Sequence, residues 1–280
     1  MKIRASLKNC FLFILIVLCL WTSDLLAQAM PIEKMSLTIE MQHVGEHEDI
    51  LTPKTVKFAQ TDKALRLFWY SLVKKLDQEA YFHTYRVEAS RGIVETDNFA
   101  GKRALILPAL WGDGYVRSET ALPLWVDPEF LSLKGKKQLP FNAGLLNVNK
   151  QLLKAAPDEV FEKVNYLQNL YDQYVSGFTV RSDIKLKKVL AKELDDFIRN
   201  FFFVVKLSES KVTIAVNRVN EEYPVVWLGN DYYELAVLND PLNPLVLNFK
   251  IHEDKTPKVL QEQFGEIAKL VNFSVKEITY

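Results

Sequence analysis

Two histidines four positions apart form the first pattern in this sequence that could hold a metal ion. The segment 43–47 reads His-Val-Gly-Glu-His, which matches the H-x-x-E-H order of inverted zinc peptidases. That chemistry needs a helix to present both imidazoles on one face. Here His43 ends a stretch of alternating residues and Gly45 disfavours a helix, so the pattern predicts a polar turn. His43 and His47 stay the candidate metal ligands, and we assign no catalytic residue and no cofactor.

Aromatic side chains beside polar groups are the second pattern with chemical content. Trp111 is followed by Asp113, and Trp125 by Asp127. Flat rings next to hydrogen-bonding groups suit a sugar face or an amphiphile, although large aromatics also fill β-sheet cores for structural reasons alone. The candidate ligand-binding residues are Trp69, Tyr81, His83, Tyr85, Trp111, Trp125, Trp227 and Tyr232.

Signatures of common enzymes are missing from the sequence. It contains no G-x-S-x-G nucleophile motif and no glycine-rich phosphate loop. Acids do lie near aromatics, and two carboxylates on one cleft could hydrolyse a glycosidic bond. A secreted hydrolase that uses paired carboxylates, or a metal held by His43 and His47, is therefore the alternative function.

Strands dominate the expected structure on both sides of a helical region. Residues 35–43 alternate apolar and polar side chains with period two, which predicts a half-buried strand. The same reasoning predicts strands over 55–59, 64–72, 81–88, 120–126, 211–217, 223–228, 232–238, 245–251 and 273–278, and a hairpin formed by 92–96 and 103–107. Helical spacing of apolar residues predicts helices over 157–177, 182–201 and 257–271.

These elements predict an α+β fold that is mainly antiparallel β, either a β-sandwich or a partly closed barrel. It would carry a two-helix insertion and a C-terminal helix. The expected organisation is a signal peptide over 1–29, an antiparallel β region over 30–141 and a helical insertion over 142–206. Residues 207–280 would complete the same domain with strands and the last helix.

The first 29 residues have the composition of a cleavable secretory signal. Basic Lys2, Arg4 and Lys8 precede the apolar run 11–21, and an Ala-Gln-Ala cleavage pattern ends at Ala29. The apolar run is shorter than the roughly 20 residues that span a bilayer, so we expect a periplasmic or extracellular protein without a stable transmembrane anchor. Anchoring through an uncleaved N-terminal segment is the alternative.

Cleavage after Ala29 would change what chemistry is available to the chain. Its only cysteines are Cys10 and Cys19, so the mature chain would have neither disulfides nor thiol chemistry. Removing three basic residues and one acid from 35 of each leaves 32 basic and 34 acidic residues, a net charge of −2. This balance gives no electrostatic basis for binding nucleic acid or anionic lipid.

The expected function is that of an exported, non-enzymatic binding or envelope-associated protein. Its partner would be an amphipathic small molecule, a lipid or a glycan, held in an aromatic-lined β cavity. The identity of that ligand and the oligomeric state do not follow from the sequence.

Overall fold

The protein is described by a computed structural model. The structure describes residues 35–41, 48–50, 52–60, 64–76, 85–97, 104–108, 111, 113–118, 121–139, 141–142, 197, 200–201, 203–256, 261 and 271–280. The predicted signal peptide over 1–29 and the candidates His43, His47, Tyr81 and His83 lie outside these residues.

Fifteen strands and two short 3₁₀ helices make up the named elements of this part of the chain. The strands are β1 (Ser36–Met41), β2 (Glu48–Ile50), β3 (Lys54–Gln60), β4 (Ala64–Leu76), β5 (Tyr85–Asp97), β6 (Ala104–Ile106), β7 (Gly114–Ser118), β8 (Ala121–Pro123), β9 (Lys137–Gln138), β10 (Phe141–Asn142), β11 (Phe203–Val216), β12 (Val219–Gly229), β13 (Tyr233–Leu238), β14 (Val246–Ile251) and β15 (Phe273–Thr279). The 3₁₀ helices are η3 (Pro128–Ser132) and η4 (Glu253–Lys255).

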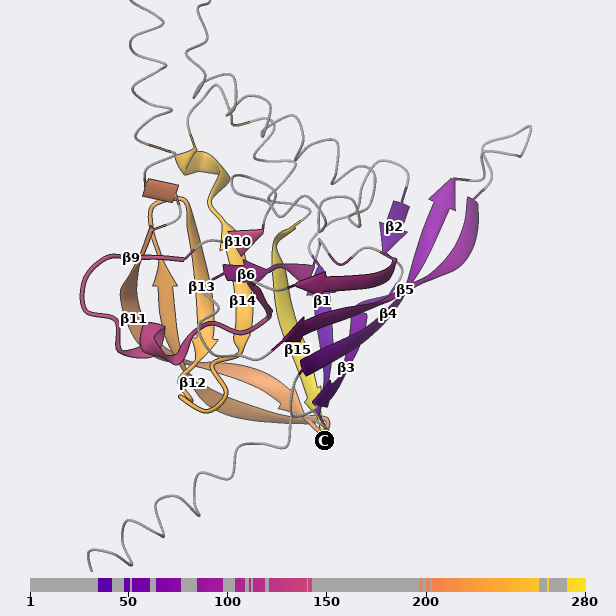
Figure 1. Ribbon diagram of the computed structural model, residues 1–280, viewed down its shortest axis with the longest axis horizontal. Coiled ribbons are helices and arrows are strands. Elements are labelled where there is room, and N and C mark those ends of the chain that lie inside the picture. The colour runs from indigo at the N-terminus through magenta and orange to yellow at the C-terminus, as the bar shows by residue number, and fades with distance from the viewer. Residues whose placement is uncertain are drawn as a thin grey trace, which may run out of the picture.

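Most of these strands belong to one large, twisted sheet that is mostly antiparallel (Figure 1). Eleven strands follow a single path in the order β7-β5-β4-β3-β1-β15-β14-β13-β12-β11-β9, and β2 pairs with β4 beside that path. The pairing of β5 with β7 is parallel. A separate small sheet contains β10, β6 and β8, which are parallel to one another.

Strands β11 to β15 form a partial ring, which is the orange and yellow half of Figure 1. β15 pairs with β14 and closes back on β11 through a short parallel contact, where Ala215 faces Glu277 and Val216 faces Ile278. On its other side β15 pairs with β1 from Ser36 to Met41. The ring is therefore not a closed barrel, because its last strand also continues the sheet toward β3 and β4.

The predicted α+β sandwich or partly closed barrel is wrong. The described part is all-β, with no α-helix among its elements and one main sheet in place of two packed sheets. The physical reason is β15, which bonds to β1 and to β14 and so joins the two halves that a sandwich would separate. The predicted helices over 157–177, 182–201 and 257–271 lie outside the described residues except at isolated positions, and the expected domain boundaries stay predictions.

Individual strands follow the sequence pattern more closely than the fold class does. The alternation predicted over 35–43 is confirmed over Ser36–Met41 by β1, where Leu37 and Ile39 are buried and Ser36 and Thr38 are half-buried; residues 42 and 43 lie outside the described residues. The predicted hairpin of 92–96 with 103–107 is wrong. β5 instead pairs with β4 and β7, and β6 pairs with β8 and β10.

Strand β5 also joins two segments that were expected to be separate strands, 81–88 and 92–96. Gly92 does not interrupt it. This glycine lies opposite Trp69 of β4 and opposite Gly114 of β7, so three neighbouring positions on one face of the sheet hold one large ring and two residues without a side chain. The indole can occupy space that two Cβ atoms would otherwise restrict.

A buried aromatic cluster stabilises the ring half of the molecule. Phe201, Tyr233, Phe249 and Phe273 are all buried, and their ring centroids follow one another at 5.4, 5.6 and 6.4 Å. Such pairs add to the free energy gained by removing the rings from water. Burial raises the pKa of the Tyr233 hydroxyl well above its ordinary value, which is consistent with a neutral side chain in the core.

Candidate functional site

Three of the tryptophans with a predicted binding role lie in the protein core. Trp69, Trp111 and Trp125 are each at most 3% exposed. The Trp125 indole nitrogen donates a hydrogen bond to Oδ1 of buried Asn243 at 2.6 Å, and its ring packs edge-on against Phe58 with a centroid distance of 5.1 Å. These contacts give Trp125 a structural role in joining the loop before β14 to strand β3.

Trp69 and Trp111 share a buried cation. Nζ of Lys54 lies 3.8 Å from the Trp69 ring centroid and 6.0 Å from that of Trp111, and it donates a hydrogen bond to the Pro108 carbonyl at 3.2 Å. A cation over an aromatic face is attracted by the ring quadrupole, and more strongly when water is excluded. Within the described residues, neither indole nitrogen has a hydrogen-bond partner. The arrangement is a polar contact inside the core, and solvent does not reach it.

The remaining predicted aromatics are distributed over separate places. Trp227 is half-buried and donates from its indole nitrogen to Oγ of Ser210 at 2.8 Å. Tyr232 is half-buried against Phe197, with ring centroids 4.8 Å apart. Tyr85 begins β5, far along the sheet from both, and is 55% exposed. The described candidates therefore do not converge on one cavity.

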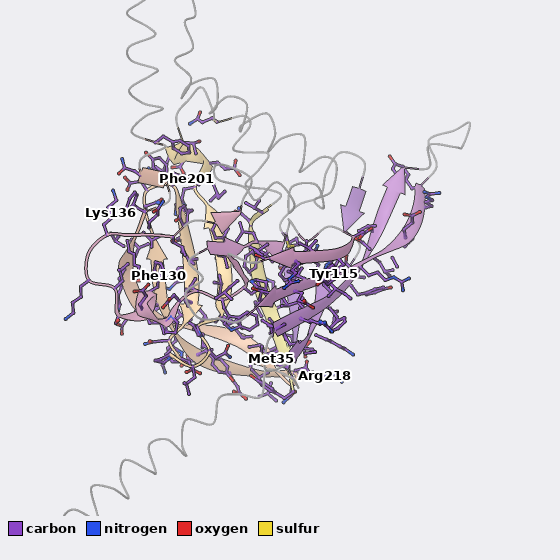
Figure 2. The ribbon with its side chains drawn as sticks, viewed as in Figure 1. Met35, Tyr115, Phe130, Lys136, Phe201 and Arg218 are labelled. Atoms are coloured by element: carbon purple, nitrogen blue, oxygen red, sulfur yellow. The ribbon has the colours of Figure 1, made fainter. Side chains whose placement is uncertain are left out.

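A different set of side chains does converge, on the face of β3, β4, β5 and β7 that points away from the core. Strand pairing places Lys57, Phe68, Ile93 and Tyr115 side by side in one row across the four strands. The next row holds Thr55, Tyr70 and Arg91. Phe68, Tyr70 and Tyr115 are 41%, 44% and 57% exposed, so three aromatic rings lie open to solvent within two adjacent rows. Figure 2 shows Tyr115 on this half of the sheet, away from Phe130 and Phe201 in the ring half. We call these two rows, together with the row described next, the outer face.

The third row of the outer face contains an ion pair that also involves Tyr115. Arg66 donates from Nε to the Glu95 carboxylate, and Arg117 lies opposite Glu95 on β7. The Arg66 hydrogen bond is the main cause that lowers the pKa of Glu95, with a smaller contribution from the Tyr115 hydroxyl, while desolvation opposes the shift. Burial and the bond to Glu95 raise the pKa of Tyr115. The hydrogen bond to Glu95 therefore fixes the position of the Tyr115 hydroxyl, and it holds the exposed ring over the sheet.

Basic side chains surround the aromatic rows. Lys57, Arg66, Arg91 and Arg117 lie on the outer face, together with two acids: Glu95 in the third row and Asp113 at the end of the second row, beside Arg91. This surface is positive on a chain whose formal net charge is zero. An open sheet face with aromatic rings between cations suits a ligand that has both an apolar face and negative charge.

One signal in the sequence could have indicated this face. From 67 to 70 both alternating sets are apolar or aromatic: Leu67 and Trp69 point inward, while Phe68 and Tyr70 point outward. A strand with one solvated face normally shows polar residues at every second position. Exposed aromatic residues at positions that are normally polar therefore identify a candidate binding surface.

The described part of the chain has a surface cleft away from the outer face and no cluster of metal-ligating side chains. Among the described residues no group of three or more His, Cys, Asp or Glu side chains is placed to hold a metal ion. A cleft of about 330 Å³ lies at the turn between β11 and β12 and is lined by Asn217, Arg218, Glu277 and Thr279. No helix in the described ranges is long and apolar enough to cross a membrane.

Comparison with known proteins gives no relative from which a function could be transferred. No family model matches the chain, no curated protein is similar to it, and no solved structure matches it.

Proposed function

We propose that this chain is an exported, non-enzymatic binding protein whose ligand is an anionic amphiphile, a lipid or a glycan, held on the outer face. The observation that carries the proposal is the row Lys57, Phe68, Ile93 and Tyr115, in which two exposed rings lie between a cation and the edge of the sheet. The sequence predicted a binding site in a cavity lined by aromatic residues. We propose a site on an open sheet surface in its place.

The dimensions of the outer face fit such a ligand. Neighbouring strands lie about 4.8 Å apart, so a row across four strands is roughly 14 Å wide, enough for several sugar rings or an acyl chain laid across the sheet. The rings of Phe68 and Tyr70 can cover its apolar side, and they are next to each other in adjacent rows of β4. Contiguous exposed aromatics on a soluble surface are a common mark of a binding site.

The positive charges supply the second half of the recognition. Arg91 lies beside Tyr70, and Lys57 beside Phe68, so each exposed ring has a cation at its flank. A phosphate or carboxylate on the ligand would pair with these groups while its apolar part covers the rings. Export is supported by the signal-like composition of residues 1–29.

The test measures binding of the purified protein to two probes that share this chemistry. One probe is phosphatidylcholine vesicles with and without phosphatidylglycerol, followed by flotation. The other is soluble polygalacturonate, followed by calorimetry. Binding to the anionic vesicles alone identifies a lipid, and binding to the polysaccharide alone identifies a glycan. Failure to bind either probe would overturn the proposal.

Variants then locate the site. The double substitution F68A/Y70A removes two exposed rings while the inward side chains of β4 stay, and we expect binding to fall about tenfold or more. The matched control is V219A/L242A, which removes apolar groups that are 61% and 50% exposed elsewhere. R91A should weaken binding mainly at low salt, because a surface charge acts through a screened interaction. Equal losses in F68A/Y70A and V219A/L242A would exclude the outer face as the site.

A further inference from the structure

Strand β5 has a backbone edge that is only partly covered. It runs from Tyr85 to Asp97, and β4 pairs with it over its whole length. On the opposite edge β7 pairs only with Gly92 to Thr96. No strand of the described part pairs with the segment Tyr85–Ala89 on that edge, which we call the free edge.

The direction of the backbone groups on the free edge follows from two contacts. The Arg91 amide donates to Oδ1 of Asp113 at 3.2 Å, on the side of β7 and away from β4. Leu72 faces Ala89. The Leu72 amide donates to Oγ1 of Thr52 and the Leu72 carbonyl accepts from the Thr52 amide, both on the far side from β5, so Leu72 and Ala89 do not bond to each other. In an antiparallel ladder, successive residues direct their N–H and C=O groups alternately toward the partner strand and away from it. The N–H and C=O groups of Tyr85, Val87 and Ala89 therefore point outward from the sheet edge.

The side chains of the free edge lie alternately on the two faces of the sheet. Tyr85 and Val87 are 55% and 60% exposed and lie on the same side of the sheet as the outer face. Arg86 and Glu88 lie on the other side, where Arg86 Nε is 2.7 Å from Glu88 Oε1. An exposed edge with apolar side chains is a template for another strand, and proteins usually protect such edges.

We infer that the free edge pairs with the free edge of a second copy of this chain, antiparallel, with Val87 opposite Val87 on a two-fold axis. In this register Tyr85 faces Ala89 of the second copy, and Arg86 faces its Glu88 in both directions. The outward groups of Tyr85, Val87 and Ala89 would form three hydrogen-bonded pairs, about six backbone hydrogen bonds in all. The segment is thus complementary to itself in shape and in charge, as a two-fold interface requires.

Neighbouring registers are disfavoured by charge. A shift that centres the axis on Arg86 places this arginine opposite its own copy, and a shift that centres it on Glu88 does the same with the two carboxylates. Like charges directly opposite each other in a ladder are destabilising. Of the registers that keep outward groups facing each other around this segment, the one centred on Val87 alone pairs opposite charges.

Asp113 limits the length of the ladder. Its carboxylate accepts hydrogen bonds from the Arg91 amide and from Ser90 Oγ at 2.7 Å, so the edge beyond Ala89 is already satisfied. A ladder of five residues buries little surface, and we expect a weak dimer whose amount rises with protein concentration.

Cysteine cross-linking tests the register directly. Cys10 and Cys19 lie within the expected signal peptide, so the cleaved protein would carry only an introduced thiol, and its mass checks that cleavage. Paired residues across a two-fold ladder have Cα atoms about 5.5 Å apart, within the range for a disulfide. We expect V87C to form a covalent dimer under mild oxidation at least about tenfold faster than V219C, a control residue that is equally exposed. Equal rates for the two variants would overturn the inference.

Charge reversal separates contacts between chains from contacts within one chain. R86E or E88R alone places like charges opposite each other in the dimer, and we expect each to slow V87C cross-linking about fivefold. Mixing R86E chains with E88R chains restores opposite charges across the axis but repairs nothing within either chain, so the mixed dimer should form at about the original rate. The control is K211E with E222K, which reverses an exposed ion pair on β11 and β12. If the mixed dimer forms no faster than the single-charge variants, the inference is wrong.

Discussion

Nζ of Lys54 lies 3.8 Å from the centroid of the Trp69 ring, and both side chains are buried in the core. The lysine reaches this position from the start of β3, beside Ile39 of β1. Its charge is balanced by a π face and by the Pro108 carbonyl, which explains how a cation is tolerated there.

Shortening Lys54 should cost more stability than removing its charge. K54A deletes the buried aliphatic stem and leaves a cavity between two tryptophans, so we expect the free energy of unfolding to fall by about 2–4 kcal/mol. K54M keeps the stem and removes both the cation and its desolvation cost, and we expect a change of about 1 kcal/mol or less. Urea unfolding followed by tryptophan fluorescence measures both. An equal loss in the two variants would show that the charge, and not the packing, is what stabilises this contact.

We expect Asn243 to be needed for stability because its side chain accepts the hydrogen bond of the buried Trp125 indole. N243A removes the acceptor of the Trp125 indole hydrogen bond and leaves a buried donor without a partner, so unfolding should become easier by about 1–3 kcal/mol. Asn220 on β12 is exposed, and N220A provides the control, with an expected change within about 0.5 kcal/mol. Denaturant midpoints of the two variants at equal slope give the comparison. A loss in N220A as large as that in N243A would contradict a specific role for the hydrogen bond.

We expect Glu95 to make the free energy of unfolding depend on pH in the acidic range. Its pKa is lowered in the folded protein, mainly by the Arg66 hydrogen bond. A carboxyl with a lowered folded pKa contributes stability that is complete above its unfolded pKa and is lost as pH falls through the folded value. We therefore expect wild-type stability to fall below about pH 4, and the fall to be smaller in E95Q.

The control for Glu95 is a carboxyl in an exposed pair. Glu222 pairs with Lys211 on the surface, where solvent screens the interaction. E222Q should leave the acid limb of the stability profile close to that of the wild type. Urea midpoints measured from neutral pH to about pH 2 test this, and identical profiles for E95Q and the wild type would mean that Glu95 titrates alike in both states.

Local periodicity predicted the strands well where one face is buried. The predicted alternation is confirmed over 36–41 by β1 and over 247–251 by β14, because a residue's side of a strand depends only on its neighbours in the chain. The same rule failed at Gly92, where a strand was expected to start and β5 in fact continues. The reason is not local, since Trp69 of another strand faces that glycine.

The candidate site was less predictable than the strands. The sequence pattern favoured tryptophans, but Trp111 and Trp125 lie in the core and Trp227 lies on another strand of the ring half. Composition cannot separate a core ring from a surface ring, because both are apolar and both occur beside turns. Phe68 and Tyr115 lie in one exposed row, on either side of Ile93, only because β4, β5 and β7 pair in this register.

The sequence by itself therefore determined the strand character of many described segments, the inward and outward sets where apolar and polar residues alternate, as in β1, and the absence of cysteine after Cys19. The tertiary structure alone decided that β15 joins β1 to β14 in one sheet, that Lys54 meets Trp69, and that the outer face gathers its rings and cations. The physical reason is the range of the interactions. Side-chain alternation is set within a few residues, whereas strand order and register depend on backbone hydrogen bonds between segments as far apart in the chain as Ser36 and Thr279.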